Sequence, residues 1–163
     1  MIRRARHEAW EAVRSLWREI DQLHAELAPA YFRPTERARN EWRQLLTAPD
    51  AAVFVAEPTG LPMSTSDRGG LAGAISVRLY DTPPDPAMIP RRRGHVEMLV
   101  VGSAYRRRGI GRGLMAEVAL WARNEGAAEL VLTVWAGNHD AEAFYERLGY
   151  RVLSSVLHAP LTR

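Results

Sequence analysis

The first part of the chain shows apolar side chains at helical and strand spacings. Between residues 7 and 28 they recur every three or four positions, which predicts a helix. A short strand is predicted before it, over 2–4, and a second helix after it, over 35–46. Thr35 is the candidate N-cap of the second helix, because a threonine side chain can accept from a free backbone N–H.

The remainder of the chain predicts mostly strands and two further helices. Strands are predicted over 51–57, 71–80, 94–101 and 129–135, a final strand or pair of short strands over 150–157, and helices over 109–124 and 138–148. The segments 58–70 and 81–90 are rich in proline and small or polar residues and are predicted loops. Asn138 is a candidate N-cap, and Gly126 fits the C-terminal cap of the helix before it.

This order of elements predicts one mixed sheet with helices, an α/β (α+β mixed) fold. The strands over 51–57 and 71–80 fit an antiparallel hairpin, whereas the strand–helix–strand unit over 94–135 requires a parallel, right-handed crossover. A chain of 163 residues can bury about 70% of its unfolded surface, and no linker separates two cores. We therefore predict a single domain over 1–163.

Composition excludes several kinds of chemistry. There is no cysteine, so thiolate metal sites and a cysteine nucleophile are excluded. All 22 basic residues are arginine, so a Walker A lysine and a lysine Schiff base are also excluded. The chain has no apolar run long enough for a membrane helix and no signal-peptide pattern, which predicts no membrane partner and a cytoplasmic location.

The positive charge is concentrated between residues 91 and 112, which hold seven arginines, although the net charge is only +3. These arginines indicate either solvated loops or a nearby anionic ligand. The small net charge and the lack of a nucleic-acid motif argue against a nucleic-acid partner.

The clearest motif runs from Tyr105 to Gly113, between a predicted strand and a predicted helix. Three alternate glycines, Gly109, Gly111 and Gly113, would let an anion approach the free N–H groups at the start of that helix. A phosphate or pyrophosphate suits this arrangement, although the glycine spacing is not that of a dinucleotide-binding motif. A tight turn with no ligand is the alternative.

The segment from Arg106 to Gly111 resembles the Q/R-x-x-G-x-G/A signature of the GNAT superfamily of acyl-CoA-dependent N-acetyltransferases. The preceding residues, Glu97 to Val101, resemble the E-x-L-x-V strand of that family. The residues from Asn138 to Tyr150 resemble its second signature, N-x-x-A-x-x-x-Y-x-x-x-G-[FY]. The resemblance covers about residues 50–157 and implies a mostly antiparallel sheet of six to seven strands, with about four helices and the one parallel pair.

The resemblance also implies acetyl-CoA as co-substrate, no metal, and a possible homodimer. By resemblance, the cofactor-binding positions are Leu99, Val101, Arg106, Arg107, Arg108, Gly109, Gly111, Arg112 and Asn138. Leu99 and Val101 would act through backbone groups, and Asn138 could also serve as a helix cap.

Two side chains are candidates for acid and base chemistry. Glu97 lies among apolar strand residues, where burial would raise its pKa toward the range of a base, and it would act through water. The alternative is a glutamate that is paired with an arginine or exposed at an edge. Tyr145 is the candidate acid for the leaving thiolate, or else a core residue of an apolar helical stripe. Without cysteine, direct transfer in a ternary complex is expected.

The acceptor amine is open between a small molecule and a peptide. Tyr31 and Phe32, between two prolines, are candidates for its pocket. His95 is either a second base or a surface residue. We interpret three tryptophans as core residues rather than as a platform for the acceptor: Trp10, Trp17 and Trp42. Three arginines have two interpretations: they contact the 3′-phosphate of coenzyme A or an acidic acceptor, or they are solvated. These are Arg91, Arg92 and Arg93. The alternative function is an acyl-CoA-binding module without catalysis.

Overall fold

The computed structural model describes residues 1–58 and 70–161. The predicted loop over 58–70 therefore lies outside the described residues, apart from its two end positions. The chain divides into two units, Met1–Thr133 and Val134–Arg163, and each is considered by itself. No helix in the described ranges combines the length and apolar character needed to cross a membrane.

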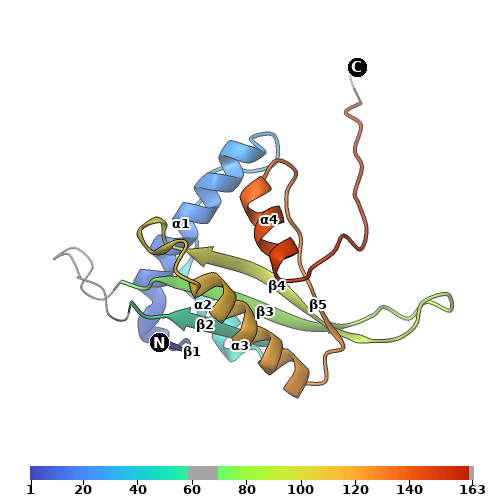
Figure 1. Ribbon diagram of the computed structural model, residues 1–163, viewed down its shortest axis with the longest axis horizontal. Coiled ribbons are helices and arrows are strands. Elements are labelled where there is room, and N and C mark those ends of the chain that lie inside the picture. Colours follow the sequence, from blue (N-terminus) through green and yellow to red (C-terminus); the bar gives the residue numbers. More distant parts are fainter. Residues whose placement is uncertain (59–69, 162–163) are drawn as a thin grey trace. The chain divides into compact units, whose positions relative to one another are not determined.

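The first unit contains a five-stranded sheet with the strands in sequence order. The strands are β1 (Ile2–Arg4), β2 (Ala51–Ala56), β3 (Gly73–Asp81), β4 (Arg92–Val101) and β5 (Glu129–Val131) (Figure 1). Neighbours are antiparallel from β1 to β4, and only β4 and β5 run parallel within the described residues. The mixed α/β fold, the antiparallel hairpin and the parallel pair are thus confirmed.

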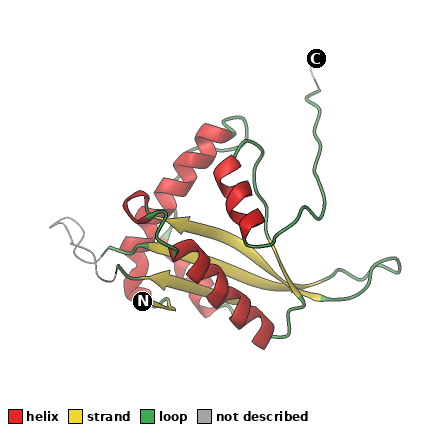
Figure 2. Cartoon of the chain, in the orientation of Figure 1, coloured by secondary structure: helices red, strands yellow, loops and turns green. Residues whose placement is uncertain are grey.

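Helices of the first unit cover both faces of this sheet (Figures 1 and 2). They are η1 (His7–Ala9), α1 (Trp10–Leu27), α2 (Arg39–Thr47), η2 (Ser103–Tyr105) and α3 (Ile110–Asn124). A Cβ added at Gly73 would meet Leu114 and Ile110 of α3, so alternate β3 residues from Gly73 face α3. The β3 residues between them, such as Ala74, pack in the core with α1 and α2.

Three tryptophans form the centre of the core between the sheet, α1 and α2. Trp10, Trp17 and Trp42 are buried, with ring centroids 5.9 to 6.4 Å apart. Such aromatic contacts add to the large apolar area that each ring buries. The prediction that these residues belong to the core is confirmed.

The second unit contains α4 (His139–Arg147) followed by an irregular segment. Asn138 caps α4, because its Oδ1 accepts from the N–H of Ala141 at 3.2 Å. Gly149 has φ +87°, which ends the helix in the left-handed conformation that glycine adopts without steric cost. The predicted helix and its cap are confirmed.

Three predictions about elements are wrong. The sheet has five strands in the described residues rather than six to seven, because 150–157 forms no strand. The strand predicted over 129–135 ends at Val131. Without a neighbouring strand, the apolar side chains of 150–157 are left exposed. The helix α2 begins at Arg39 instead of Thr35, and its N-cap is Ala38. Ala38 is extended, and Arg37 just before it pairs with Asp21 of α1.

Candidate functional site

A β-bulge places Glu97 on β4. The pairing of β3 with β4 passes from Ser76–Met98 to Val77–Val96, so Glu97 is an extra residue with no partner on β3. Bulges redirect side chains and occur often beside active sites. Here the bulge puts Met98 in the core beneath α1 and α2, with Glu97 beside it at the surface of the sheet.

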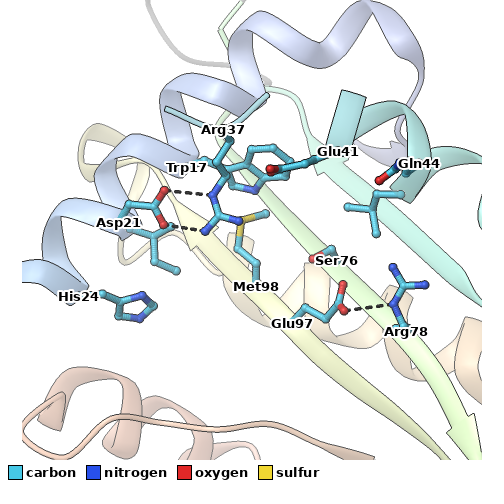
Figure 3. Close-up of a pocket in the computed structure, with 12 residues that line it drawn as sticks. Trp17, Asp21, His24, Arg37, Glu41, Gln44, Ser76, Arg78, Glu97 and Met98 are labelled. Carbon is cyan, nitrogen blue, oxygen red and sulfur yellow. Dashed lines mark hydrogen bonds and ion pairs between the residues drawn. The ribbon is translucent and has the colours of Figure 1, made fainter. Parts of the chain in front are cut away.

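Glu97 lines a pocket of about 380 Å³ between the sheet, α1 and α2 (Figure 3). This volume lies within the range of small-molecule sites. The pocket is lined by apolar and charged side chains: Trp17, Ile20, Asp21, His24, Arg37, Glu41, Gln44, Leu45, Ser76, Arg78, Glu97 and Met98. Three carboxylates and two guanidinium groups therefore face one cavity.

One wall of the pocket is fixed by a bidentate ion pair. Arg37 donates from Nε and Nη2 to the two carboxylate oxygens of Asp21, at 3.0 and 2.7 Å. Its guanidinium also lies 5.1 Å from the centre of the Trp17 ring. Burial lowers the pKa of His24, which outweighs the opposing charge of Asp21, so a neutral imidazole faces the pocket at pH 7.

The surroundings of Glu97 are more exposed and more polar than its apolar sequence neighbours predict. The predicted burial is wrong: its side chain is 35% exposed, and Oε1 accepts from Nε of Arg78 at 3.2 Å. Glu97 is therefore a glutamate paired with an arginine, which is the alternative interpretation of its sequence position. Arg78 also donates from Nη1 to Asp50 at 3.1 Å, so it links two carboxylates (Figure 3 shows its bond to Glu97).

The glycine motif forms a turn with two left-handed residues. Arg107 has φ +63° and Gly109, the N-cap of α3, has φ +78°. In the described part of the chain, the backbone N–H groups of residues 107–112 make no hydrogen bond to another backbone group. Together with the helix dipole, such a run of free donors can bind a phosphate group.

Arg106 uses its side chain within the protein. Its Nε donates to the carbonyl of Val101 at 3.2 Å, and its Nη2 lies 3.9 Å from Glu19 of α1. Glu19 also accepts from the N–H of Ser103 at 3.2 Å. By contrast, the side chains of Arg107, Arg108 and Arg112 form no ion pair with any residue that the structure describes, so they are free to meet an anion.

The strand before this turn offers a free backbone edge. β5 pairs with β4 only from Arg93 to His95, so the same edge of β4 has no strand partner from Val96 to Val101 among the described residues. Leu99 and Val101 lie on this stretch, next to the turn. An extended ligand could therefore hydrogen-bond along it.

In the second unit, Tyr145 lies in an aromatic cluster on α4. Its ring centroid is 5.1 Å from Phe144 and 5.6 Å from Tyr150. Burial, assisted by the charge of Tyr150, raises the pKa of Tyr145 to about 12. The hydroxyl therefore stays protonated at neutral pH and has a proton to donate.

The remaining candidate residues from the sequence lie partly outside the pocket and partly against its wall. Arg91 and Arg93 both pair with Glu129, at 3.5 and 2.7 Å. His95 lies edge-on against Tyr80, with centroids 6.5 Å apart, and does not line the pocket. Tyr31 is exposed, whereas Phe32 stacks at 5.0 Å on His24 of the pocket wall.

Sequence reasoning missed Asp21, Arg37, Asp50 and Arg78. Two of them carried a signal: Asp21 lies on the apolar stripe of α1, and Arg78 is a charged residue within an apolar strand. Within the described ranges, no group of three or more histidine, aspartate or glutamate side chains is placed to hold a metal ion.

The chain is similar in sequence to proteins named acetyltransferases and similar in fold to several solved structures. Mycothiol acetyltransferase of Propionibacterium freudenreichii is 29% identical over 147 residues, 87% of this chain, and the chain spans only 43% of that protein's length. The BH1408 protein of Bacillus halodurans superposes with a TM-score of 0.89 at 24% identity, covering 99% of both chains. Aminoglycoside N-acetyltransferase AAC(6')-Iy, in complex with CoA, superposes with a TM-score of 0.71 at 18% identity over the whole of both chains.

The family comparison covers most of the chain, including the pocket, the glycine motif and α4. A model of the "Acetyltransferase (GNAT) family" matches residues 10–150. The chain belongs to the GNAT acetyltransferase family.

Proposed function

We propose that this protein is an N-acetyltransferase that moves an acetyl group from acetyl-CoA to a primary amine by direct transfer in a ternary complex. Members of its family are acyltransferases with acetyl-CoA as co-substrate. The observation that carries the proposal is the run of free N–H groups over 107–112 at the start of α3. These donors suit the pyrophosphate of coenzyme A.

The cofactor would lie along the turn and the free edge of β4. The backbone of Arg107, Arg108, Gly109, Gly111 and Arg112 would hold the pyrophosphate, and the free arginine side chains would add positive charge. The backbone of Leu99 and Val101 would pair with the pantetheine arm. Arg106 would support the turn from behind rather than touch the cofactor, since its side chain is bound to Val101.

The acceptor amine would occupy the pocket beside Glu97. It arrives as an ammonium ion and must lose a proton before its nitrogen can attack the acetyl carbon. Glu97 would take this proton through water, which reaches its partly exposed carboxylate. The new C–N bond forms as the C–S bond breaks, and the hydroxyl of Tyr145 would donate its hydrogen to the departing thiolate. Asn138 would combine its capping role with a contact to the pantetheine arm.

The class of acceptor is a small-molecule or peptide amine. The pocket volume favours a small amine or a single terminal residue rather than a longer segment. A single domain over 1–163, a cytoplasmic location and pairing as a homodimer stay predictions.

The test is an amine panel with acetyl-CoA, followed by release of free thiol. The panel holds ethanolamine, glucosamine, spermidine and a short peptide with a free N-terminus. We expect Glu97→Gln to lower kcat about 100-fold and Tyr145→Phe to lower it about tenfold, with the Kd of acetyl-CoA unchanged. Full turnover in both variants would contradict the assigned roles, and binding without any thiol release across the panel would favour the non-catalytic acyl-CoA-binding module.

A further inference from the structure

Arg78 joins the candidate base to a second carboxylate. Its Nε donates to Oε1 of Glu97 at 3.2 Å, and its Nη1 donates to Oδ1 of Asp50 at 3.1 Å. The second oxygen of Glu97, Oε2, has no partner among the residues the structure describes. One oxygen of the carboxylate is thus held while the other is open to a proton.

The backbone holds the Asp50 side of this arrangement and leaves the Glu97 side without a partner strand residue. The carbonyl of Asp50 accepts from the N–H of Leu79 at 2.7 Å, so Asp50 is tied to the strand that carries Arg78. Glu97 occupies the bulge of β4, where no partner residue on β3 restricts its backbone. A side chain on a bulge has less support from its neighbours, and an oriented guanidinium, whose donors form a rigid fork, can supply that support.

We propose that Arg78 is a positioning residue for Glu97: its guanidinium, oriented by Asp50, holds Oε1 and leaves Oε2 to receive the proton from the acceptor ammonium through water. Arg78 keeps its own proton throughout. This inference rests on the proposed role of Glu97 as the base.

Arg78 is the side chain that holds Glu97, although other charged or titratable groups lie around it. These groups come from other elements and are Asp21, His24, Arg37, Glu41 and Asp50. Among the described residues, only Arg78 forms a hydrogen bond or ion pair with the Glu97 side chain. Lysine carries the same charge but lacks the planar fork, so Arg78→Lys separates the effect of charge from that of geometry.

The experiment compares Arg78→Gln, Arg78→Lys and Asp50→Asn in the full chain. It uses acetyl-CoA and the panel amine that is acetylated fastest. In Arg78→Gln we expect kcat to fall about tenfold while KM for the amine changes by less than about twofold, because a positioning residue acts on proton transfer and not on binding. In Asp50→Asn, Arg78 keeps its bond to Glu97 but loses the contact that orients it, so kcat should fall by less, about threefold. Arg78→Lys keeps the charge but lacks the fork, so its kcat should remain low.

A matched control and a double variant separate positioning from structure. Arg3→Gln breaks an Arg–Glu pair of similar exposure, Arg3 with Glu57 at 2.6 Å, and should change neither kcat nor KM for the amine. In a Glu97→Gln background, Arg78→Gln should cause no further loss of kcat. Acetyl-CoA Kd and Tm are measured for every variant to verify folding.

Two results would overturn the role of Arg78: equal losses from Arg78→Gln with and without Glu97, or a raised KM for the amine at unchanged kcat in Arg78→Gln. Neither result would affect the proposed function. Full activity of Glu97→Gln alone would instead remove Glu97 as the base, so the two failures are distinguishable.

Discussion

The pair of Asp21 and Arg37 should stabilise the fold far more than an ordinary surface ion pair. The Asp21 side chain is only 10% exposed, and both of its oxygens accept from Arg37. In Arg37→Gln this carboxylate would remain buried without its charged partner. Breaking a buried pair typically costs 3–5 kcal/mol, but Arg37 is 38% exposed and water can reach part of the vacated space, so we expect about 2 kcal/mol.

Urea unfolding followed by circular dichroism measures this loss, with a fall in Tm of about 4–8 °C as the thermal counterpart. The control is Arg18→Gln, which breaks a pair between α1 and Glu36 at 2.6 Å whose side chains are 50% and 67% exposed, and should cost less than about 0.5 kcal/mol. The double variant Asp21→Asn/Arg37→Gln should regain stability over Arg37→Gln, since no buried charge is left. Equal effects of Arg37→Gln and Arg18→Gln would refute this reasoning.

Three further predictions concern the core, the turn and α4. Trp42→Ala should lower the free energy of unfolding by about 3–5 kcal/mol, because the ring is fully buried, and a loss below 1 kcal/mol in urea would contradict the assignment. Gly109→Ala should cost only about 1 kcal/mol, from its φ of +78°, since an added Cβ meets nothing within 4 Å; a larger loss would indicate an unseen clash. The pKa of Tyr145 is about 12 in the folded protein and about 10 in the unfolded chain, so the protein should lose about 2 kcal/mol of stability relative to Tyr145→Phe as pH rises from 10 to 12; parallel pH profiles of the two proteins would contradict this.

The elements that the sequence predicts correctly are those with strong local signals. The periodic apolar residues of α1, the cap at Asn138 and the glycine-rich turn at Gly109 all depend on side chains close in sequence. The start of α2 is wrong because a distant contact, Arg37 with Asp21, decides it. The strand over 150–157 is wrong because a strand needs a neighbour, which the local pattern does not supply.

The candidate site likewise has one part that the local sequence predicts and one part that depends on distant contacts. The turn over 106–112 could be predicted, since its conformation depends on its own glycines and backbone. The surroundings of Glu97 could not, because they depend on a bulge that skips one residue and on an arginine 19 positions earlier. A regular strand with apolar neighbours predicts burial, whereas the bulge leaves the carboxylate exposed beside Arg78.

The most direct test of the central claim is thermal unfolding at increasing concentrations of acetyl-CoA. Ligand at about 100 times Kd adds roughly 2.7 kcal/mol to the free energy of unfolding, which should raise Tm by about 5–10 °C. Gly111→Asp, which places a carboxylate among the free N–H groups at the start of α3, should abolish the shift, whereas Gly126→Asp beyond the other end of α3 should retain it. A saturable shift with this pattern supports the cofactor site. No shift with any acyl-CoA, or an equal shift in Gly111→Asp, would contradict it.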